Sequence, residues 1–231
     1  MVTLAENIES GKGLYLADEA AFYARIHPKT MRRWLEGSTQ GERVFQPARE
    51  GGEQKFATFL DFVQALAIRS VRTSPNLKIS LQKIRKAVTF AEERGVTYPF
   101  ARKHTTYWDG KDIHIKLDGK EFFQATGKHI DQASLRHIVE VYMFDLRFSA
   151  LTGLADGYRA FSWAGHDIDM NPEIRFGEPI VTSCQYTAQS LWDATASEGG
   201  VEAAARAYGV KETEVECAVR YFDYLQPKLV G

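Results

Sequence analysis

The sequence predicts a mainly α-helical protein with a small antiparallel β component. Apolar residues recur at helical spacing in residues 59–72 and 77–91, and they alternate with polar residues in 113–117. An alanine, a turn residue and a larger apolar residue occur at the same spacing in residues 21–31 and 205–215, as two helices joined by a tight turn require. We expect three regions: a winged helix-turn-helix in 1–96, a β-meander plus helix for linkage or dimerisation in 97–166, and a small helical domain in 167–231.

Composition is that of an ordinary soluble globular protein. Of the 231 residues, 44% are hydrophobic and 26% are charged, and the formal net charge is −1. This charge gives no global argument for nucleic-acid binding, so any basic surface must be local. The two cysteines, Cys184 and Cys217, are too few for a disulfide framework and are expected to be buried free thiols. Residues 1–13 lack a signal-peptide core and no run approaches the ~20 apolar residues of a membrane span, which predicts a cytoplasmic protein.

Residues 14–37 are predicted to form two helices around a turn. The first helix has an apolar face made of Leu16, Ala20, Ala21 and Ala24. Pro28 suits the first position of the second helix, where its missing N–H costs nothing. That helix is expected to bury Met31, Trp34 and Leu35, and Arg25 stands at the turn, where glycine would be usual.

The opposite face of the second helix carries the candidate DNA-binding residues. Short strand-like pieces at 43–46 and 55–58, around a polar loop, form the expected wing. Thr30 and Arg33 are one turn apart, so both can face a DNA groove, and arginine can pair with guanine. The DNA-binding set is Lys29, Thr30, Arg32, Arg33, Arg49 and Lys55. The alternative is a solvated basic helix face.

Two further helices are expected after the wing, at 59–72 and 77–91, with Ser80 as an N-cap and Gly95 as a stop. Together with the preceding elements, this order over residues 14–95 resembles the MerR-type winged helix, which implies DNA binding. The chain departs from that family downstream: no cysteine precedes Cys184 and no long heptad run follows, which weakens an inducer-sensing role. The cations Lys78, Lys83, Arg85 and Lys86 either contact phosphates or form the wet face of a helix.

The middle region is predicted to contain strands and one helix. Strands are expected at 107–108, 113–117 and 122–123, with hairpin turns at Asp109–Gly110 and Asp118–Gly119. Asp131 is predicted to cap a helix reaching Leu146, whose apolar stripe is either core or a subunit interface. Residues 151–166 are expected to be a connector.

The string 171–181, Asn-Pro-Glu-Ile-Arg-Phe-Gly-Glu-Pro-Ile-Val, is predicted to be extended because of its prolines and non-helical apolar spacing. A helix pair follows in 201–225, with Ala205, Gly209 and Val215 at the spacing of a helix-turn-helix. Residues 169–225 resemble the short domain of VapB-type antitoxins, whose partners are PIN-domain ribonuclease toxins of the VapC type. The family's Gly-Thr-Arg-like turn is replaced here by residues 182–187, so a contact through that arginine is not implied.

The last predicted helix is mostly acidic on its outer face, which is expected to carry Lys211, Glu212, Glu214, Glu216 and Arg220. Acidic groups repel phosphate, so this face suits a protein partner with a basic RNA-binding cleft. The partner-binding set is Arg175, Phe176, Glu212, Glu216 and Arg220.

Catalytic and metal-binding patterns are absent from the sequence. The six histidines do not fall in metal-ligand spacings, and no GxSxG, P-loop or GxGxxG string occurs. We therefore expect no enzyme, metal or cofactor. The expected function is an antitoxin, a homodimeric repressor that also blocks a PIN-domain ribonuclease.

Two alternatives stay open. One is a stand-alone MerR-like transcription regulator with a small-molecule pocket built from Tyr107, Trp108, Phe122 and Phe123. The other is an interaction module with no DNA role.

Overall fold

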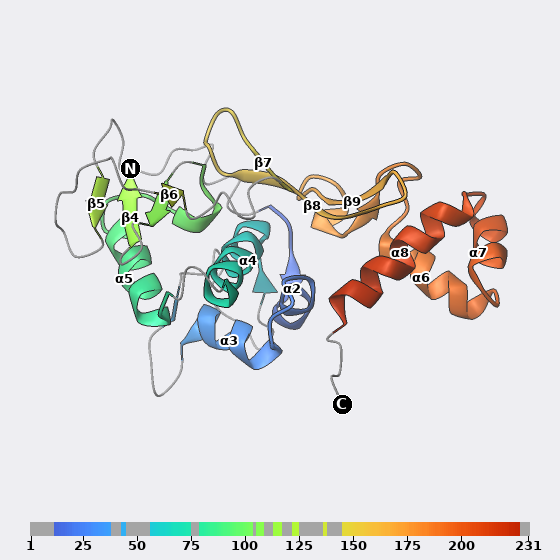
Figure 1. The fold of residues 1–231 in the computed structure, drawn as a ribbon, viewed down its shortest axis with the longest axis horizontal. Helices are drawn as coiled ribbons and strands as arrows, with labels where there is room; N and C mark the ends of the chain where they lie inside the picture. The colour runs from blue at the N-terminus through green and yellow to red at the C-terminus, as the bar shows by residue number, and fades with distance from the viewer. Residues whose placement is uncertain are drawn as a thin grey trace. The chain divides into compact units, whose positions relative to one another are not determined.

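The computed structural model describes residues 12–37, 43–44, 56–74, 79–103, 105–108, 113–116, 122–124, 136–137 and 145–226. These residues form seven α-helices and small antiparallel sheets, which agrees with the mainly α-helical class (Figure 1). The chain divides into two compact units between Asp156 and Gly157, whereas the sequence placed boundaries after residues 96 and 166. In the part of the chain that is described, no helix is long and apolar enough to cross a membrane.

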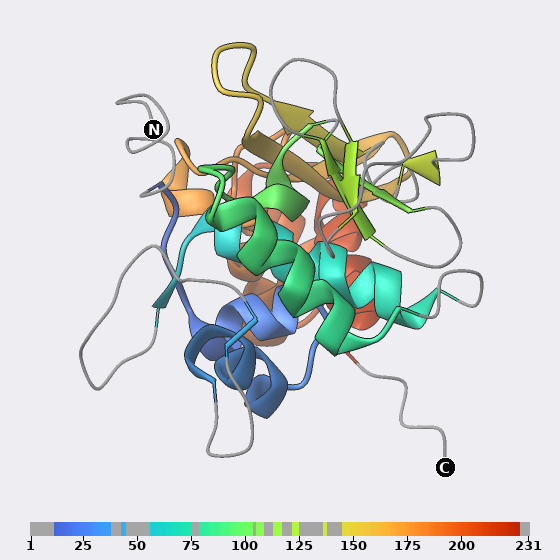
Figure 2. The ribbon, with the colours of Figure 1, turned by 90° about the vertical axis from the view of Figure 1, so that its left-hand side faces the viewer.

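The first unit contains four helices at the positions that the sequence predicts. They are α2 (Ala17–Tyr23), α3 (Pro28–Glu36), α4 (Phe59–Thr73) and α5 (Leu81–Glu92), coloured from blue to green in Figure 2. The Ser80 hydroxyl accepts the Lys83 N–H at 3.3 Å and so caps α5 as expected. The predicted core residues Met31, Trp34 and Leu35 of α3 are all buried.

A two-stranded sheet joins the start of the first unit to the segment before α4. Strand β1 (Tyr15–Leu16) pairs antiparallel with β2 (Phe56–Ala57). The predicted wing placed residues 55–58 opposite 43–46, but Arg43 and Val44 are not in a strand, and the partner of β2 is β1. This pairing places Tyr15 opposite Ala57, and both are buried, with the centre of the Tyr15 ring 5.7 Å from that of Phe62 in α4. Leu16 is 44% exposed and belongs to β1, so it does not extend the apolar face of α2.

A second sheet has the strand order β5-β4-β3-β6. Strands β3 (Thr106–Trp108), β4 (Ile113–Lys116) and β5 (Phe122–Gln124) form an antiparallel meander, which confirms the predicted strands. The turn pairs at 109–110 and 118–119 lie outside the described residues.

The helix predicted for residues 131–146 is wrong where the structure describes that segment. Strand β6 (Arg136–His137) pairs with β3, and β7 (Leu146–Phe148) begins at the last residue of the supposed helix. The spacing of apolar residues carries no information about pairing with a distant strand. Here the edge of β3 offers main-chain hydrogen-bond partners to Arg136–His137, so this segment forms a strand and not a helix. Residues 138–144 lie outside the described part of the chain.

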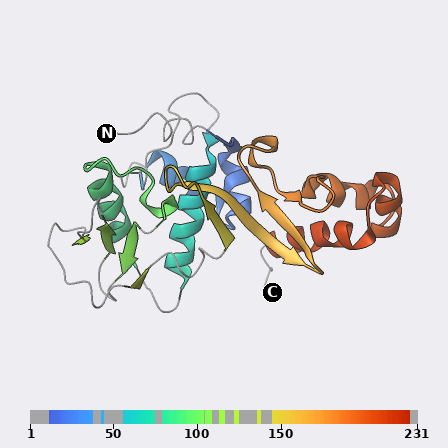
Figure 3. The ribbon, with the colours of Figure 1, turned by 90° about the horizontal axis from the view of Figure 1, so that it is seen from above.

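The second unit combines a β-hairpin with three helices. Strand β8 (Ala155–Trp163) pairs with β9 (His166–Met170), and β9 pairs with β10 (Ile180–Val181) (Figure 3). The predicted connector at 151–166 is therefore largely strand. Ala164 and Gly165 form the turn between β8 and β9. Both residues have positive φ, as a two-residue hairpin turn requires.

Helices α6 (Ala188–Ser197), α7 (Val201–Tyr208) and α8 (Glu212–Leu225) pack against one another, and α8 also packs on β9. The Trp192 and Phe222 rings stack at 4.9 Å between α6 and α8. Sequence reasoning did not single out α6. Its start is nevertheless signalled by Thr187, whose hydroxyl accepts the Ser190 N–H at 3.1 Å.

Candidate functional site

Two helix pairs, one in each unit, have the same turn geometry. In the first helix pair (α2 and α3), Arg25 N–H donates to the Phe22 carbonyl at 2.9 Å and Ile26 N–H donates to Ala21 at 2.8 Å. In the second helix pair (α7 and α8), Gly209 N–H donates to Arg206 at 3.3 Å and Val210 N–H donates to Ala205 at 3.0 Å. The same two carbonyls of the preceding helix are thus satisfied in both pairs.

The side chains packed between the two helices of each pair also lie at corresponding positions. Ala21 and Met31 are buried in the first pair, as are Ala205 and Val215 in the second. The turn residues adopt the left-handed region, with φ of 53° at Arg25 and 65° at Gly209. The spacing of alanine, turn residue and apolar plug therefore has the structural role that the sequence predicts at both places.

The outer face of α3 is basic and accessible. Lys29, Arg32 and Arg33 are exposed and Thr30 is half-buried. Arg32 makes an ion pair with Asp18 of α2, so this guanidinium also ties the two helices together. His27 caps the start of the helix, because its Nδ1 accepts the Lys29 N–H at 3.2 Å. The other predicted DNA-binding residues, Arg49 and Lys55, lie outside the described residues.

Sequence reasoning did not propose Arg25 and Arg69 as functional residues, although both lie at the turn of the first helix pair. Arg25 is exposed, and its carbonyl accepts a hydrogen bond from Arg69 Nε of α4 at 3.1 Å. The signal that could have found Arg25 is a long cationic side chain at a position whose backbone favours glycine.

Two weaker candidates in the first unit remain as predictions. On α5, Lys86 is exposed while Lys83 and Arg85 are half-buried, and Lys78 lies outside the described residues. For the proposed aromatic pocket, Tyr107 is half-buried. The side chains of Trp108, Phe122 and Phe123 lie outside the described part of the chain.

The string 171–181 is extended only at its end, and its middle is a strained turn. The Asn171 side-chain oxygen accepts the Glu173 N–H at 2.9 Å, which starts a turn where a strand was predicted. Arg175 and Phe176 have φ of 46° and 56°, so two consecutive non-glycine residues lie in the left-handed region. Phe176 is 76% exposed at this turn.

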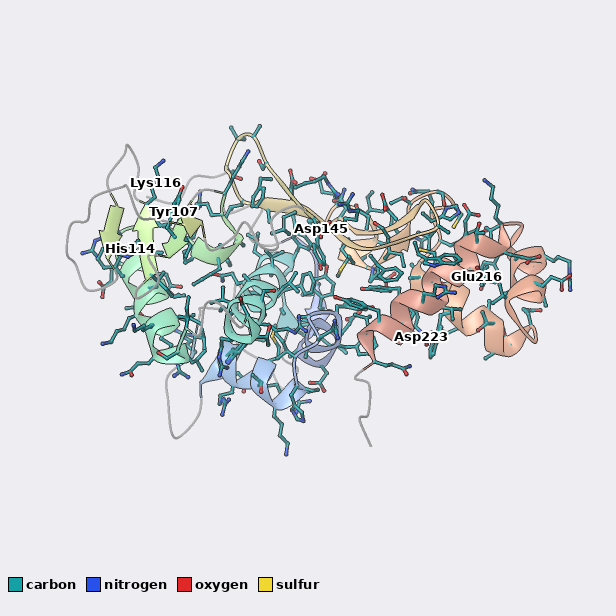
Figure 4. All side chains as sticks on the ribbon, viewed as in Figure 1. Tyr107, His114, Lys116, Asp145, Glu216 and Asp223 are labelled. Carbon is teal, nitrogen blue, oxygen red and sulfur yellow. The ribbon has the colours of Figure 1, made fainter. Side chains whose placement is uncertain are left out.

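The predicted partner-binding residues of α8 are only partly accessible. Glu212 and Arg220 are exposed and Glu216 is half-buried. The Arg220 guanidinium lies 4.5 Å from the centre of the Trp163 ring, so it covers an aromatic side chain of β8. Glu216 and the exposed Asp223 both lie on α8 (Figure 4).

Glu214 does not point outward as predicted, because it is only 5% exposed. Burial disfavours its charged form, but the Ser183 hydroxyl, the Lys211 N–H at 2.8 Å and the nearby His166 outweigh that effect and lower the pKa of Glu214. The carboxylate therefore caps the start of α8 from inside the unit.

The face of α8 that corresponds to the basic face of α3 is partly covered by its own unit, because Glu214 and Cys217 are buried there. The Thr213 hydroxyl lies 3.0 Å from His166 Nε2, and His166 Nδ1 lies 2.9 Å from the Ser183 hydroxyl. The Cys217 thiol donates to the His166 carbonyl at 3.6 Å. Cys217 and Arg33 occupy corresponding positions, eight residues after the turn residue of each pair. The position that is an exposed arginine in α3 is thus a buried thiol in α8.

Both cysteines are free thiols with low reactivity. Burial raises the pKa of Cys217 to about 11, and it also raises the pKa of Cys184. Among the described residues, no group of three or more histidine, cysteine or acidic side chains is arranged to hold a metal ion.

Comparison with known proteins gives a relationship in fold. Neither a family model nor a curated protein matches this sequence. The chain is similar to the crystal structure of Rv2018 from Mycobacterium tuberculosis, with a TM-score of 0.61 and 14% sequence identity. The match covers 89% of this chain and 96% of that chain. The protein therefore shares its fold with Rv2018 over most of both chains.

Proposed function

We propose that the protein is an antitoxin of a type II toxin–antitoxin pair, which neutralises a PIN-domain ribonuclease and represses its own operon as a homodimer. One observation carries this proposal: of two helix pairs with the same turn geometry, the first presents an exposed basic face on α3, whereas the second is partly covered by its own unit and carries exposed acidic residues beside basic ones on α8. The first suits DNA and the second suits a basic protein.

The DNA-binding role is assigned to the first helix pair, as a MerR-like helix-turn-helix. Residues 20–35 contain four arginine or lysine residues and no acidic residue, and three of these cations lie on α3. A helix-turn-helix protein places the N-terminal part of its second helix against base edges, while its cations neutralise phosphates. Thr30 and Arg33 are the candidates for base contact, and Lys29 is the candidate for phosphate contact. Arg32 contributes less to DNA binding because it is already paired with Asp18.

The toxin-binding role is assigned to the second unit. Aromatic residues are enriched at the centre of protein interfaces, and Phe176 is exposed on a strained turn, a combination that is typical of functional loops. Acidic side chains on α8, including Glu212 and Asp223, would complement the cations with which a ribonuclease binds RNA phosphates. The resemblance of residues 171–181 to VapB-type antitoxins supplies the class of partner.

The proposal predicts a stable complex with the product of a neighbouring PIN-domain gene. Co-expression, size exclusion with multi-angle light scattering and a ribonuclease assay would measure the complex and its inhibition. Phe176→Ala should weaken binding by about 30-fold or more, because a buried aromatic anchor contributes about 2 kcal/mol or more to an interface. The matched control is Leu151→Ala, which truncates an apolar side chain that is 81% exposed in the first unit and should leave binding unchanged.

The outcomes separate the proposal from its alternatives. A wild-type chain that forms no complex and leaves the ribonuclease active would rule out the antitoxin role. Retained DNA binding would then identify a stand-alone regulator, whereas loss of both activities would leave an interaction module.

A further inference from the structure

Arg25 occupies a backbone conformation that disfavours it. An L-residue in the left-handed region is less stable than glycine by about 1 kcal/mol, and the corresponding turn of the second helix pair uses Gly209. Both turns make the same main-chain hydrogen bonds, so the arginine side chain is not needed to form the turn.

Other cationic residues lie near Arg25 in the fold or follow it in the chain. The Arg69 guanidinium lies beside the turn, because its Nε donates to the Arg25 carbonyl at 3.1 Å. The turn directly precedes the first residue of α3, Pro28, and the exposed Lys29 and Arg33 follow on that helix.

We propose that Arg25 binds a backbone phosphate of DNA beside the N-terminus of α3. This inference rests on the proposed DNA-binding role of the first helix pair and adds a residue to it. A guanidinium at the turn contacts the sugar–phosphate backbone next to the groove that α3 enters, which fixes the position of the helix without reading sequence. The proposal accounts for an arginine being kept where glycine would be more stable.

The test is Arg25→Gly, for which stability and DNA affinity should move in opposite directions. The thermal midpoint should rise by a few degrees, because glycine removes the left-handed strain. Affinity for a short duplex of random sequence and for the protein's own promoter should fall by the same factor, about 5- to 10-fold. Fluorescence anisotropy between about 50 and 200 mM salt should show the slope of log K against log salt reduced by about 1.

Two further variants sharpen the test. Arg25→Lys keeps the charge at the same backbone conformation and should retain most of the salt slope. Arg206→Ala removes an exposed cation of α7, where it is paired with Glu202, and should leave DNA binding unchanged.

Three results would overturn the proposal in distinguishable ways. If wild-type protein binds neither duplex, the DNA-binding function itself is wrong, and this inference falls with it. If wild-type protein binds but Arg25→Gly keeps the wild-type affinity and salt slope, only the role of Arg25 is wrong. A loss confined to the promoter duplex would mean that Arg25 contacts a base and not a phosphate.

Discussion

The two helix pairs share a backbone design but differ in what their second helix can touch. Both have a buried alanine, a left-handed turn residue and a buried plug, which are Ala21, Arg25 and Met31 in one pair. In α3 the two residues after the plug, Arg32 and Arg33, are exposed and basic. In α8 the matching face is partly closed, because Thr213 and Cys217 bond to His166 of β9, which also bonds to Ser183. The same local motif can therefore present a helix to a ligand or lock it into a core.

This difference bears on whether the second helix pair could enter a DNA groove. Thr213, Glu214 and Cys217 all bond to groups within their own unit. Insertion into a groove would require these bonds to break and would bring acidic residues towards phosphates. The second helix pair is therefore poorly suited to enter a DNA groove.

The largest expected effect comes from removing a plug residue. Met31→Ala should lower the free energy of unfolding by about 2–5 kcal/mol, because it leaves a cavity between α2 and α3. Val215→Ala, the matched change in the second helix pair, should cost about 2 kcal/mol because fewer buried methyl groups are lost. Urea denaturation followed by circular dichroism measures both variants. A cost below about 1 kcal/mol for Met31→Ala would contradict its role as the plug.

The next effect concerns the exposed face of α3. Arg33→Ala should weaken binding to the protein's own promoter by about 10- to 100-fold and relax sequence preference, because one bidentate base contact is lost. Electrophoretic mobility shift with promoter and mutated promoter fragments measures both quantities. Cys217→Ala changes the corresponding position in α8 and should leave DNA affinity as it is. Unchanged affinity and preference in Arg33→Ala would remove α3 as the reading helix.

A smaller effect tests the turn residues. At Gly209 a methyl group would meet nothing within 4 Å, so the cost of Gly209→Ala comes from the φ of 65° alone. We expect a loss of about 1 kcal/mol in unfolding free energy by thermal denaturation. Arg25→Ala exchanges one L-residue for another at φ 53° and should change stability by less than about 0.5 kcal/mol. Equal losses in the two variants would mean that the turns are not equivalent.

The smallest expected effect is a pH dependence of stability at the start of α8, which the start of α3 should not show. The lowered pKa of Glu214 means that its carboxylate stabilises the folded state above the ordinary pKa, and this stabilisation is lost as pH falls through the lowered value. Glu214→Gln should therefore cost about 1 kcal/mol at neutral pH and progressively less as the pH falls below the ordinary pKa of glutamate. Denaturation midpoints across this pH range measure the difference. A cost that is independent of pH would show that the charge of Glu214 does not stabilise α8. Thr30 occupies the matching position of α3, and because threonine carries no charge, we expect no such pH dependence at the start of that helix.

Much of the helical framework was predictable because its signals are local. Helix α3 begins at Pro28 and α5 is capped by Ser80, and both starts can be read from the chemistry of one or two residues. The spacing around Gly209 likewise specifies a turn that needs a left-handed residue. The candidate DNA-binding residues on α3 follow from the same periodicity, since the buried face of a helix defines its exposed face.

Only the tertiary structure decided which distant segments pair with each other. The strand at Arg136–His137 forms because β3 offers it an edge, although the local apolar spacing favours a helix. The pairing of β2 with β1, the burial of Glu214 and the covering of Cys217 by β9 also depend on residues far away in the sequence. The sequence by itself determined the starts of α3 and α5 and the turn at Gly209, because those choices are made within a few residues. The fold decided which of their faces stay accessible, because exposure depends on what the rest of the chain packs against them.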